Sequence, residues 1–350
     1  MLRKPTLHDV ASLARVSTRT VSRVVNNESG YSADTRARVE AAIEQLGYRP
    51  NLAARSLITN RTRTIGLVVT HLTDPFFPEL ADGVMRAARD RGYTMFLSST
   101  EDHEPTQRDV LDSLASHGVE AAIVFPANGS DESLAEAAND GMPIVVIDHE
   151  MDHPNIGVVS SDIRRGAAMA VTHLIETGHR RIGMVASSRS PRSRRWREKG
   201  YEDAFGAAGH RVDQTMVARQ PPTIAGGRAA TATLLESNPD LTALFAYNDL
   251  MAIGAIAELK SLGRSVPDDV AVVGFDDIPL TEYVGPPITT VRLGRDRVGA
   301  AAVDLAIAMR EDSEHRLSRS SSASNSSTAR RPDALSGAMS ARLTASSVAA

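Results

Sequence analysis

The segment from residue 6 to residue 26 reads TLHDVASLARVSTRTVSRVVN and contains the signals for two short helices. Thr6 and Asp9 have the spacing of a capping box, in which the two side chains satisfy backbone amides at a helix start, so we expect a helix to begin at Leu7. Ser17 offers the N-cap of a second helix after a break in the apolar pattern. Ala11, Val16 and Val21 are small or branched residues, and their spacing allows the two helices to cross closely. The segment therefore predicts a helix-turn-helix.

Positive charge is concentrated in the same part of the chain. Residues 1–63 contain eleven Lys/Arg and five Asp/Glu, a net charge of +6, so the remaining residues carry −10 if the whole chain carries −4. This asymmetry indicates a polyanionic partner for the N-terminal segment, and a solvated basic arm is the alternative interpretation. A third helix, expected from near Ala33 to an end at Gly47, completes the predicted helical domain.

Three stretches of this domain carry a family resemblance: Thr6–Ala11, Val16–Ser17 and Thr20–Asn26. They resemble the lactose/galactose repressor family, in which the second helix lies in the major groove of DNA. The resemblance implies that Thr18, Arg19 and Arg23 contact base edges. A guanidinium can pair with both acceptor atoms of guanine, which contributes ~1–3 kcal/mol of discrimination. Short polar residues complete the implied DNA-binding set, most of them suited to phosphate contacts: Thr6, Ser17, Thr20, Ser22 and Asn26. The alternative is a small packing module with surface arginines.

Residues 48–57, YRPNLAARSL, resemble the hinge helix of that family, which is ordered only when two protomers meet on DNA. One or two helical turns are marginal alone in water, which agrees with this resemblance. The resemblance implies that Leu57 enters the minor groove and bends the duplex at a cost of ~a few kcal/mol, and that Asn51 and Ala54 also contact DNA. We expect a pyrimidine–purine step at the operator centre, because such steps bend most easily. The alternative is that Leu57 packs on the rest of the chain.

From Thr64 onward, short apolar runs alternate with helical segments. Such runs are typical of parallel strands buried on both faces, and they predict a doubly wound sheet. Four runs come first: residues 65–69, 94–97, 121–125 and 144–147. Three more follow after an interval: residues 182–186, 243–246 and 270–274. The repetition predicts an α/β body of two lobes, with a ligand site in the cleft where the carboxyl ends of the strands meet.

Polar and aromatic residues follow several of these runs, as they do in the same repressor family, whose body resembles sugar-binding periplasmic proteins. The resemblance covers roughly residues 6–315. It implies an apolar wall from Phe76 or Phe77. The other residues that the resemblance implies are Asp148, Arg197, Asn248 and Asp276, and we add Ser193 and Trp196 to the predicted effector-binding set. Carboxylate, amide and guanidinium groups together can form hydrogen bonds with several hydroxyls, which fits a sugar or another polyol.

Residues 189–197, RSPRSRRWR, differ from the family pattern by being heavily basic. Two interpretations remain open. Several guanidiniums near a cleft favour a phosphorylated or carboxylated sugar. A solvated loop with only Arg197 turned inward is the alternative. Trp196 either stacks on a sugar ring or packs inside its lobe.

The composition restricts the function classes. The chain has no cysteine, which excludes disulfides, thiolate zinc sites and cysteine nucleophiles and makes a reducing cytoplasm its natural setting. Its beginning has no apolar run of the kind a signal peptide or a membrane span needs. The pair Asp276 and Asp277 lacks an accompanying nucleophile–base motif, phosphate-binding loop or metal-ligand cluster. We therefore expect no enzyme activity, no cofactor and no metal.

The chain from Ser318 onward does not match the family, whose members usually close with an apolar strand and an Arg-x-Ser-Thr ending. Residues 318–329 read SRSSSASNSSTA and cannot form a core. Translating the stretch in a reading frame shifted by two bases, with GC-rich codons, can give the expected ending. One hypothesis is a frameshift that replaced the last strand and left a disordered segment. The other is a natural flexible tail of low complexity.

The predicted divisions are a helix-turn-helix domain (1–49), a hinge (50–63), an effector-binding and dimerisation domain (64–317, with an N-lobe of 64–161 and 292–317 and a C-lobe of 162–291) and a tail (318–350). We predict a cytoplasmic, nucleoid-associated transcriptional repressor controlled by a sugar or sugar derivative. A homodimer on a near-palindromic operator is expected, because one helix-turn-helix reads only a half-site. The alternative is a freestanding cytoplasmic small-molecule-binding protein without operator-specific DNA binding.

Overall fold

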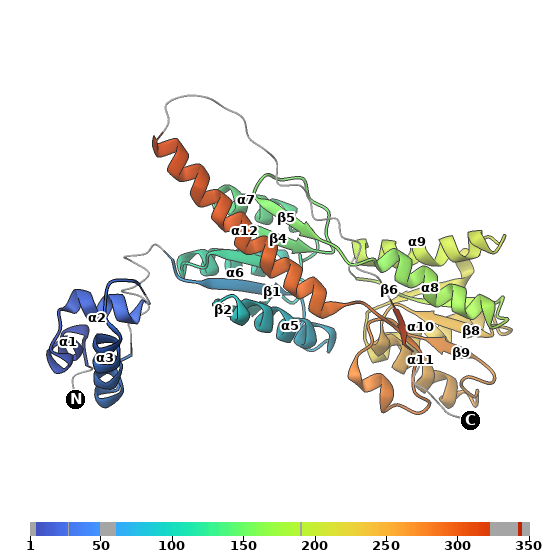
Figure 1. Cartoon of the computed structure of the whole chain (residues 1–350). Coiled ribbons are helices and arrows are strands. Elements are labelled where there is room, and N and C mark those ends of the chain that lie inside the picture. The colour runs from blue at the N-terminus through green and yellow to red at the C-terminus, as the bar shows by residue number, and fades with distance from the viewer. Residues whose placement is uncertain (1–4, 27, 50–60, 190, 323–341, 345–350) are drawn as a thin grey trace. The chain divides into compact units, whose positions relative to one another are not determined.

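The computed structural model describes residues 5–26, 28–49, 61–189, 191–322 and 342–344 of the chain. The chain divides into two compact units, residues 1–62 and residues 63–350, which are described one after the other (Figure 1).

The first unit is a small helical domain with its own apolar core. Its helices are α1 (Leu7–Ala14), α2 (Thr18–Val25) and α3 (Ala33–Leu46). The capping box at α1 is present, since the Thr6 amide donates to Asp9 Oδ2 at 2.7 Å and the Asp9 amide donates to Thr6 Oγ1 at 3.4 Å. Arg15, with φ of 55°, turns the chain between α1 and α2, and Ser17 Oγ caps α2 by accepting from the Thr20 amide at 3.1 Å. The predicted helix-turn-helix is confirmed.

The N-lobe of the second unit is a parallel sheet covered by helices on both faces. Its strands are β1 (Thr64–Val69), β2 (Thr94–Ser99), β3 (Ala121–Val124), β4 (Ile144–Ile147) and β5 (Ile156–Val159), in the order β2-β1-β3-β4-β5. Its first helices are α5 (Phe76–Asp90), α6 (Glu104–Ser116) and α7 (Asp131–Asn139). Alternate side chains of the strands enter two separate cores: α5 packs on one, and α6 and α7 pack on the other. This is the doubly wound arrangement that the apolar runs predict.

The C-lobe repeats the arrangement. Its parallel strands are β6 (Ile182–Ser187), β7 (Val217–Gln220), β8 (Ala243–Ala246) and β9 (Ala271–Val273), in the order β7-β6-β8-β9. Its helices are α8 (Ile163–Glu176), α9 (Pro191–Ala207), α10 (Ile224–Ser237) and α11 (Asp249–Ser261), with the 3-10 turns η1 (Gln214–Met216) and η2 (Pro279–Glu282). One core lies between the sheet and the α8–α9 pair, and another lies beneath α10 and α11. The predicted two-lobed α/β body is confirmed.

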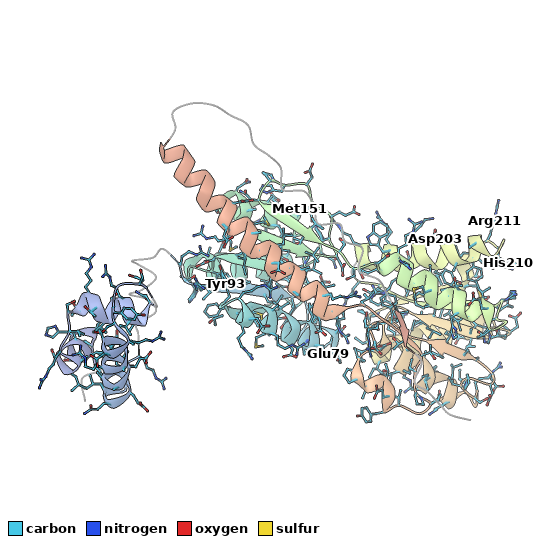
Figure 2. All side chains as sticks on the ribbon, in the orientation of Figure 1. Glu79, Tyr93, Met151, Asp203, His210 and Arg211 are labelled. Atoms are coloured by element: carbon cyan, nitrogen blue, oxygen red, sulfur yellow. The ribbon has the colours of Figure 1, made fainter. Side chains whose placement is uncertain are left out.

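The chain returns from the C-lobe to the N-lobe after β10 (Thr290–Arg292). Leu293 still belongs to a C-lobe core, whereas α12 (Arg295–Ser322, orange in Figure 1) packs beside α5 on the N-lobe. Arg295 secures the return at its N-lobe end by an ion pair with Glu79 of α5, which is labelled in Figure 2. The two lobes are therefore connected by two short segments, residues 160–162 between β5 and α8 and residues 293–294 between β10 and α12.

The tail differs in two places from the expectation of a disordered stretch beginning at Ser318. Residues 318–322 continue α12, and β11 (Arg342–Thr344) pairs antiparallel with β10. A sheet ladder is made by backbone groups, so a sequence that lacks the family's ending can still supply a short strand. The rest of the tail lies outside the described residues.

Within the described part of the chain, none of the helices is long and apolar enough to cross a membrane.

Candidate functional site

The first candidate site is the polar surface of α1 and α2 in the helical domain. Thr6, Ser17, Thr18 and Arg19 are exposed, and Thr20, Ser22, Arg23 and Asn26 are partly buried. Several of these side chains also stabilise the helices: Thr6 Oγ1 donates to Asp9 Oδ2 at 2.7 Å, Ser17 and Thr20 hydroxyls lie 2.9 Å apart, and Asn26 Nδ2 donates to Ser22 Oγ at 3.4 Å. Arg19 is the most accessible of the predicted base-contacting guanidiniums. The predicted hinge residues Asn51, Ala54 and Leu57 lie outside the described residues.

The second candidate site is a cavity of about 540 Å³ between the two lobes of the body. Seven of the eight predicted effector-binding residues line it: Phe76, Phe77, Asp148, Ser193, Arg197, Asn248 and Asp276. Asp148 follows β4, Asn248 follows β8 and Asp276 follows β9, so the carboxyl ends of parallel strands bring these groups together, as the topology predicts.

The eighth predicted residue, Trp196, packs against the core between α8, α9 and the C-lobe sheet instead of lining the cavity. The structure therefore favours packing over ring stacking for this side chain. The reason is helix periodicity: Trp196 precedes Arg197 on α9, and consecutive residues of a helix point about 100° apart.

The N-lobe side of the cavity is an aromatic wall. Phe76 and Phe77 begin α5, and Phe125 follows β3. The three rings contact one another edge to face, with centroids 5.3 Å apart for Phe76–Phe77, 6.1 Å for Phe76–Phe125 and 5.3 Å for Phe77–Phe125. This geometry is the favourable one for aromatic pairs and gives the cavity a fixed apolar surface.

A buried guanidinium occupies the C-lobe side of the cavity. Arg197 lies between the rings of Tyr247 and Phe275, with its Cζ 4.3 Å and 4.2 Å from their centroids. Its Nη2 donates to Asp276 Oδ1 at 3.2 Å, and its Nη1 donates to Ser193 Oγ. The Tyr247 hydroxyl also donates to Ser193 Oγ, at 3.2 Å. Because each neighbour fixes another, the cluster presents its polar groups in one orientation.

Three carboxyl groups of the cavity feel the charge of this buried cation. Burial raises the pKa of Asp276 well above its ordinary value, although Arg197 acts in the opposite direction. Burial also raises the pKa of Asp148 and of Asp74, against weaker opposing effects of hydrogen bonds and of Arg197. The cleft thus holds buried carboxyls with raised pKa values, which can donate as well as accept hydrogen bonds.

Asp148 and Asn248 are held by the backbone around them. Asp148 has φ of 53°, and its carboxylate accepts from the Ser161 amide at 2.5 Å and the Ser161 hydroxyl at 3.0 Å. Asn248 caps α11 by accepting from the Met251 amide at 2.9 Å. Both residues therefore have structural partners besides any ligand in the cavity.

Sequence reasoning missed several lining residues, among them His71, Asp74, Phe125, Asn128, His149 and Tyr247. Asp74 and Tyr247 had a usable signal, because each follows a β-strand run and stands within three residues of a predicted site residue. His149 had the same signal beside Asp148. Nothing in the sequence separates Asn128 from an ordinary loop residue. Among the described residues, no group of three His, Asp or Glu side chains is arranged to hold a metal ion.

Two family models match the chain. The one described as "Bacterial regulatory proteins, lacI family" matches residues 6–51, and the one described as "Periplasmic binding proteins and sugar binding domain of LacI family" matches residues 62–326. The chain is 35% identical over 313 residues to the HTH-type transcriptional repressor PurR of Aliivibrio fischeri (strain ATCC 700601 / ES114), which covers 89% of this chain and 93% of the relative. It is also 35% identical over 307 residues to the HTH-type transcriptional regulator GalR of Escherichia coli (strain K12), with 88% and 90% covered.

Solved structures of similar proteins include both DNA-bound and ligand-bound regulators. The transcriptional regulator CelR in complex with cellobiose is similar with a TM-score of 0.70 and 32% identity, covering 97% of this chain and 98% of that one. The lac repressor dimer bound to operator and the anti-inducer ONPF is similar with a TM-score of 0.78 and 26% identity, covering 89% and 94%.

Proposed function

This chain belongs to the LacI family of bacterial regulatory proteins, and from that premise we propose that it is a homodimeric repressor released from or recruited to its operator by an uncharged sugar. The observation that carries the effector part is the cavity between the lobes, with its aromatic wall, its buried Arg197–Asp276 pair and its buried carboxyl groups. We assign the protein no catalytic role, and its place of action is the cytoplasm, at the chromosome.

The DNA-binding part rests on α2, whose N-terminal residues Thr18 and Arg19 are exposed and whose Arg23 is partly buried. A helix entering the major groove reads bases through such residues near its N-terminus. Replacing Arg19 by alanine should remove ~1–3 kcal/mol of discrimination between the operator and a variant operator. Arg36→Ala is the matched control, because Arg36 lies on α3 and pairs with Glu40.

The assay is a competition gel shift on the region upstream of the protein's own gene. Equal affinity of the wild-type protein for that region and for random DNA, with and without sugars, would favour the freestanding small-molecule-binding protein instead. A loss of discrimination in Arg19→Ala but not in Arg36→Ala supports base reading by α2.

The proposed dimer surface lies on the N-lobe, where β2 is an edge strand. Large apolar side chains are exposed there: Met85 (39%), Phe96 (44%) and Leu97 (41%). An edge strand with exposed apolar residues is a liability for a monomer, and a second copy would cover it. Phe96→Glu should shift the protein to monomer in light scattering, whereas Leu262→Glu, at a 54% exposed leucine of the C-lobe, should not.

The cavity's chemistry favours an uncharged sugar over an anionic one. The aromatic wall can contact the apolar face of a sugar ring, while Arg197, Asp276 and Asn248 offer fixed donors and acceptors to its hydroxyls. A phosphate or carboxylate would be placed among Asp74, Asp148 and Asp276, and the two guanidiniums that line the cavity are each already paired, Arg197 with Asp276 and Arg192 with Asp131. The similarity to CelR, whose structure contains cellobiose, supports the same class of ligand.

A thermal-shift panel of neutral sugars, sugar phosphates and nucleobases tests this assignment. A ligand at about 100 times its Kd stabilises the folded body by ~2.7 kcal/mol. We expect neutral sugars to raise the Tm and Asp276→Asn to abolish the increase. Stabilisation by sugar phosphates or nucleobases alone would contradict an uncharged sugar. Once a stabilising sugar is identified, the gel shift with and without it measures the coupling free energy between effector binding and operator binding, which is typically ~1–3 kcal/mol. The sign of this coupling tells whether the sugar releases the repressor or recruits it.

A further inference from the structure

The basic segment of α9 contains one arginine that reaches across the cleft. Arg192 belongs to the C-lobe, and its Nη2 donates to Asp131 Oδ2 at 2.8 Å while its Nη1 donates to the Glu150 carbonyl at 2.8 Å. Asp131 begins α7 and Glu150 follows β4, so both acceptors belong to the N-lobe. Arg192 and Asp131 both line the cavity. One guanidinium therefore joins the two lobes at the cavity's edge.

The acceptor of this bridge is held in position from the N-lobe side. His149 Nε2 lies 2.8 Å from the other carboxylate oxygen of Asp131, and the His149 residue is only 8% exposed. Burial, reinforced by Arg192, lowers the pKa of His149, so the neutral ring can donate its Nε2–H to Asp131. Asp131 also lies in the first turn of α7, where a negative charge is favourable. A preoriented acceptor loses less freedom when the bridge forms.

The other arginines of the segment do not make this contact. Arg194 pairs with Glu198 of its own helix at 3.6 Å, and Arg189 and Arg195 are exposed. Arg197 is buried within the C-lobe and bonds Asp276. Because the arginines of the segment lie in such different positions, the contact between the lobes depends on Arg192 alone among them and not on the total positive charge of the segment.

We propose that Arg192 is an interlobe latch that closes the effector cleft in the absence of ligand and so sets the affinity and release rate of the effector. The inference rests on the proposed effector role of the cleft. The side chains of Arg192 and Asp131 are 43% and 51% exposed, so solvent screens the pair. A pair of this kind shifts an open–closed equilibrium by about fivefold. If the effector binds the closed form, the latch tightens binding by a similar factor.

Lobe separation in the ligand-free protein is the direct readout. The chain has no native cysteine, so Asp109→Cys on α6 and Ala207→Cys at the end of α9 introduce two spin-label sites per protomer, and an excess of unlabelled protein isolates the distance within one protomer of the proposed dimer. We expect Arg192→Ala to increase the population in which the two labels are far apart. Arg192→Lys should restore part of the population with a short label-to-label distance, and Arg195→Ala should leave the distance distribution unchanged. Arg195→Ala removes the same charge from an exposed position of the same helix.

Effector kinetics provide the second readout, with a neutral sugar from the thermal-shift panel as the probe. Arg192→Ala should weaken binding about fivefold, mainly through faster release. Identical distance distributions in wild type and Arg192→Ala would overturn the latch even if sugars bind. A wider distribution in Arg192→Ala, with no sugar bound by any variant, would support the latch and refute the effector class. Equal effects of Arg192→Ala and Arg195→Ala would also overturn it, because the cause would then be charge alone.

Discussion

Removing the buried cation of the cleft tests how its carboxyl groups are balanced. In Arg197→Met, the guanidinium between the Tyr247 and Phe275 rings is lost, together with the 3.2 Å contact to Asp276, while methionine retains part of the apolar volume. The side chains of Arg197 and Asp276 are 5% and 8% exposed, so water cannot replace the lost partner fully. The substitution therefore leaves a buried carboxyl without its counter-charge.

The expected cost follows from the structure. Removing one partner of a buried ion pair costs ~3–5 kcal/mol, and the lost cation–π contacts contribute about 1 kcal/mol each to that range. Asp276 can offset part of this by binding a proton, since burial already raises its pKa. A carboxyl with a raised folded-state pKa destabilises the fold as pH rises through the range between its unfolded and folded values. We therefore expect a loss of ~2–4 kcal/mol at pH 8 and a smaller loss at pH 5.

Urea unfolding of the full chain at pH 5 and pH 8 measures this difference. Asp276→Asn should partly rescue Arg197→Met, because the double variant no longer contains the carboxylate that bonded Arg197. Arg195→Met is the control, since it removes an exposed arginine of the same helix. A loss below about 1 kcal/mol, or one equal at both pH values, would refute the charge balance proposed for the cleft.

Three further substitutions test other parts of the structure. Burial raises the pKa of Asp249 to about 7, so the free energy of unfolding should fall by up to ~1.4 kcal/mol per pH unit between about pH 4 and pH 7. Asp249→Asn should make the Tm depend less on pH over this range, even though the substitution disturbs one hydrogen bond. Gly200→Ala would place a Cβ 2.2 Å from the Arg164 carbonyl oxygen and force α8 and α9 apart, which should lower the free energy of unfolding by ~3 kcal/mol. The control is Gly206→Ala on the same helix, whose Cβ meets no atom within 4 Å and which should raise the Tm slightly. Ser17→Ala removes the acceptor of the Thr20 amide and should destabilise α2 by ~1 kcal/mol, seen as faster hydrogen exchange at that amide.

Most of the fold was predictable because its signals are local. The capping residues Thr6 and Ser17 and the apolar runs such as residues 65–69 depend on the neighbouring sequence, and the structure contains the helices and strands they predict. Strands β5, β7, β10 and β11 were not predicted. β5 contains Gly157, whose position is close to the Leu305 and Met309 side chains of α12, and a distant contact of that kind leaves no local pattern. β7 is a short edge strand of mixed burial, VARQ.

The sequence predicts the site residues that follow strand ends. It does not predict properties that depend on the surroundings of a side chain, such as its pKa or its contacts with distant residues. Asp148 and Asp276 could be placed at strand ends, but their raised pKa values depend on burial by the other elements. Asn248 illustrates the converse, because a residue expected to bind a ligand also caps α11. The reach of Arg192 to Asp131 joins residues 61 positions apart and has no sequence signature.

The basic segment shows why composition alone does not give the charge of a ligand. Successive residues of a helix point about 100° apart, so the arginines of α9 are distributed around the helix, and of this run only Arg192 and Arg197 line the cavity. Ser193 and Arg197, four positions apart, share the inward face and bond each other, while Arg195 is exposed and Arg192 reaches the N-lobe. The cavity therefore receives two guanidiniums from this segment, and each is already paired with a carboxylate, Arg197 with Asp276 and Arg192 with Asp131. The pairing offsets the basic charge of the segment, and this favours an uncharged effector.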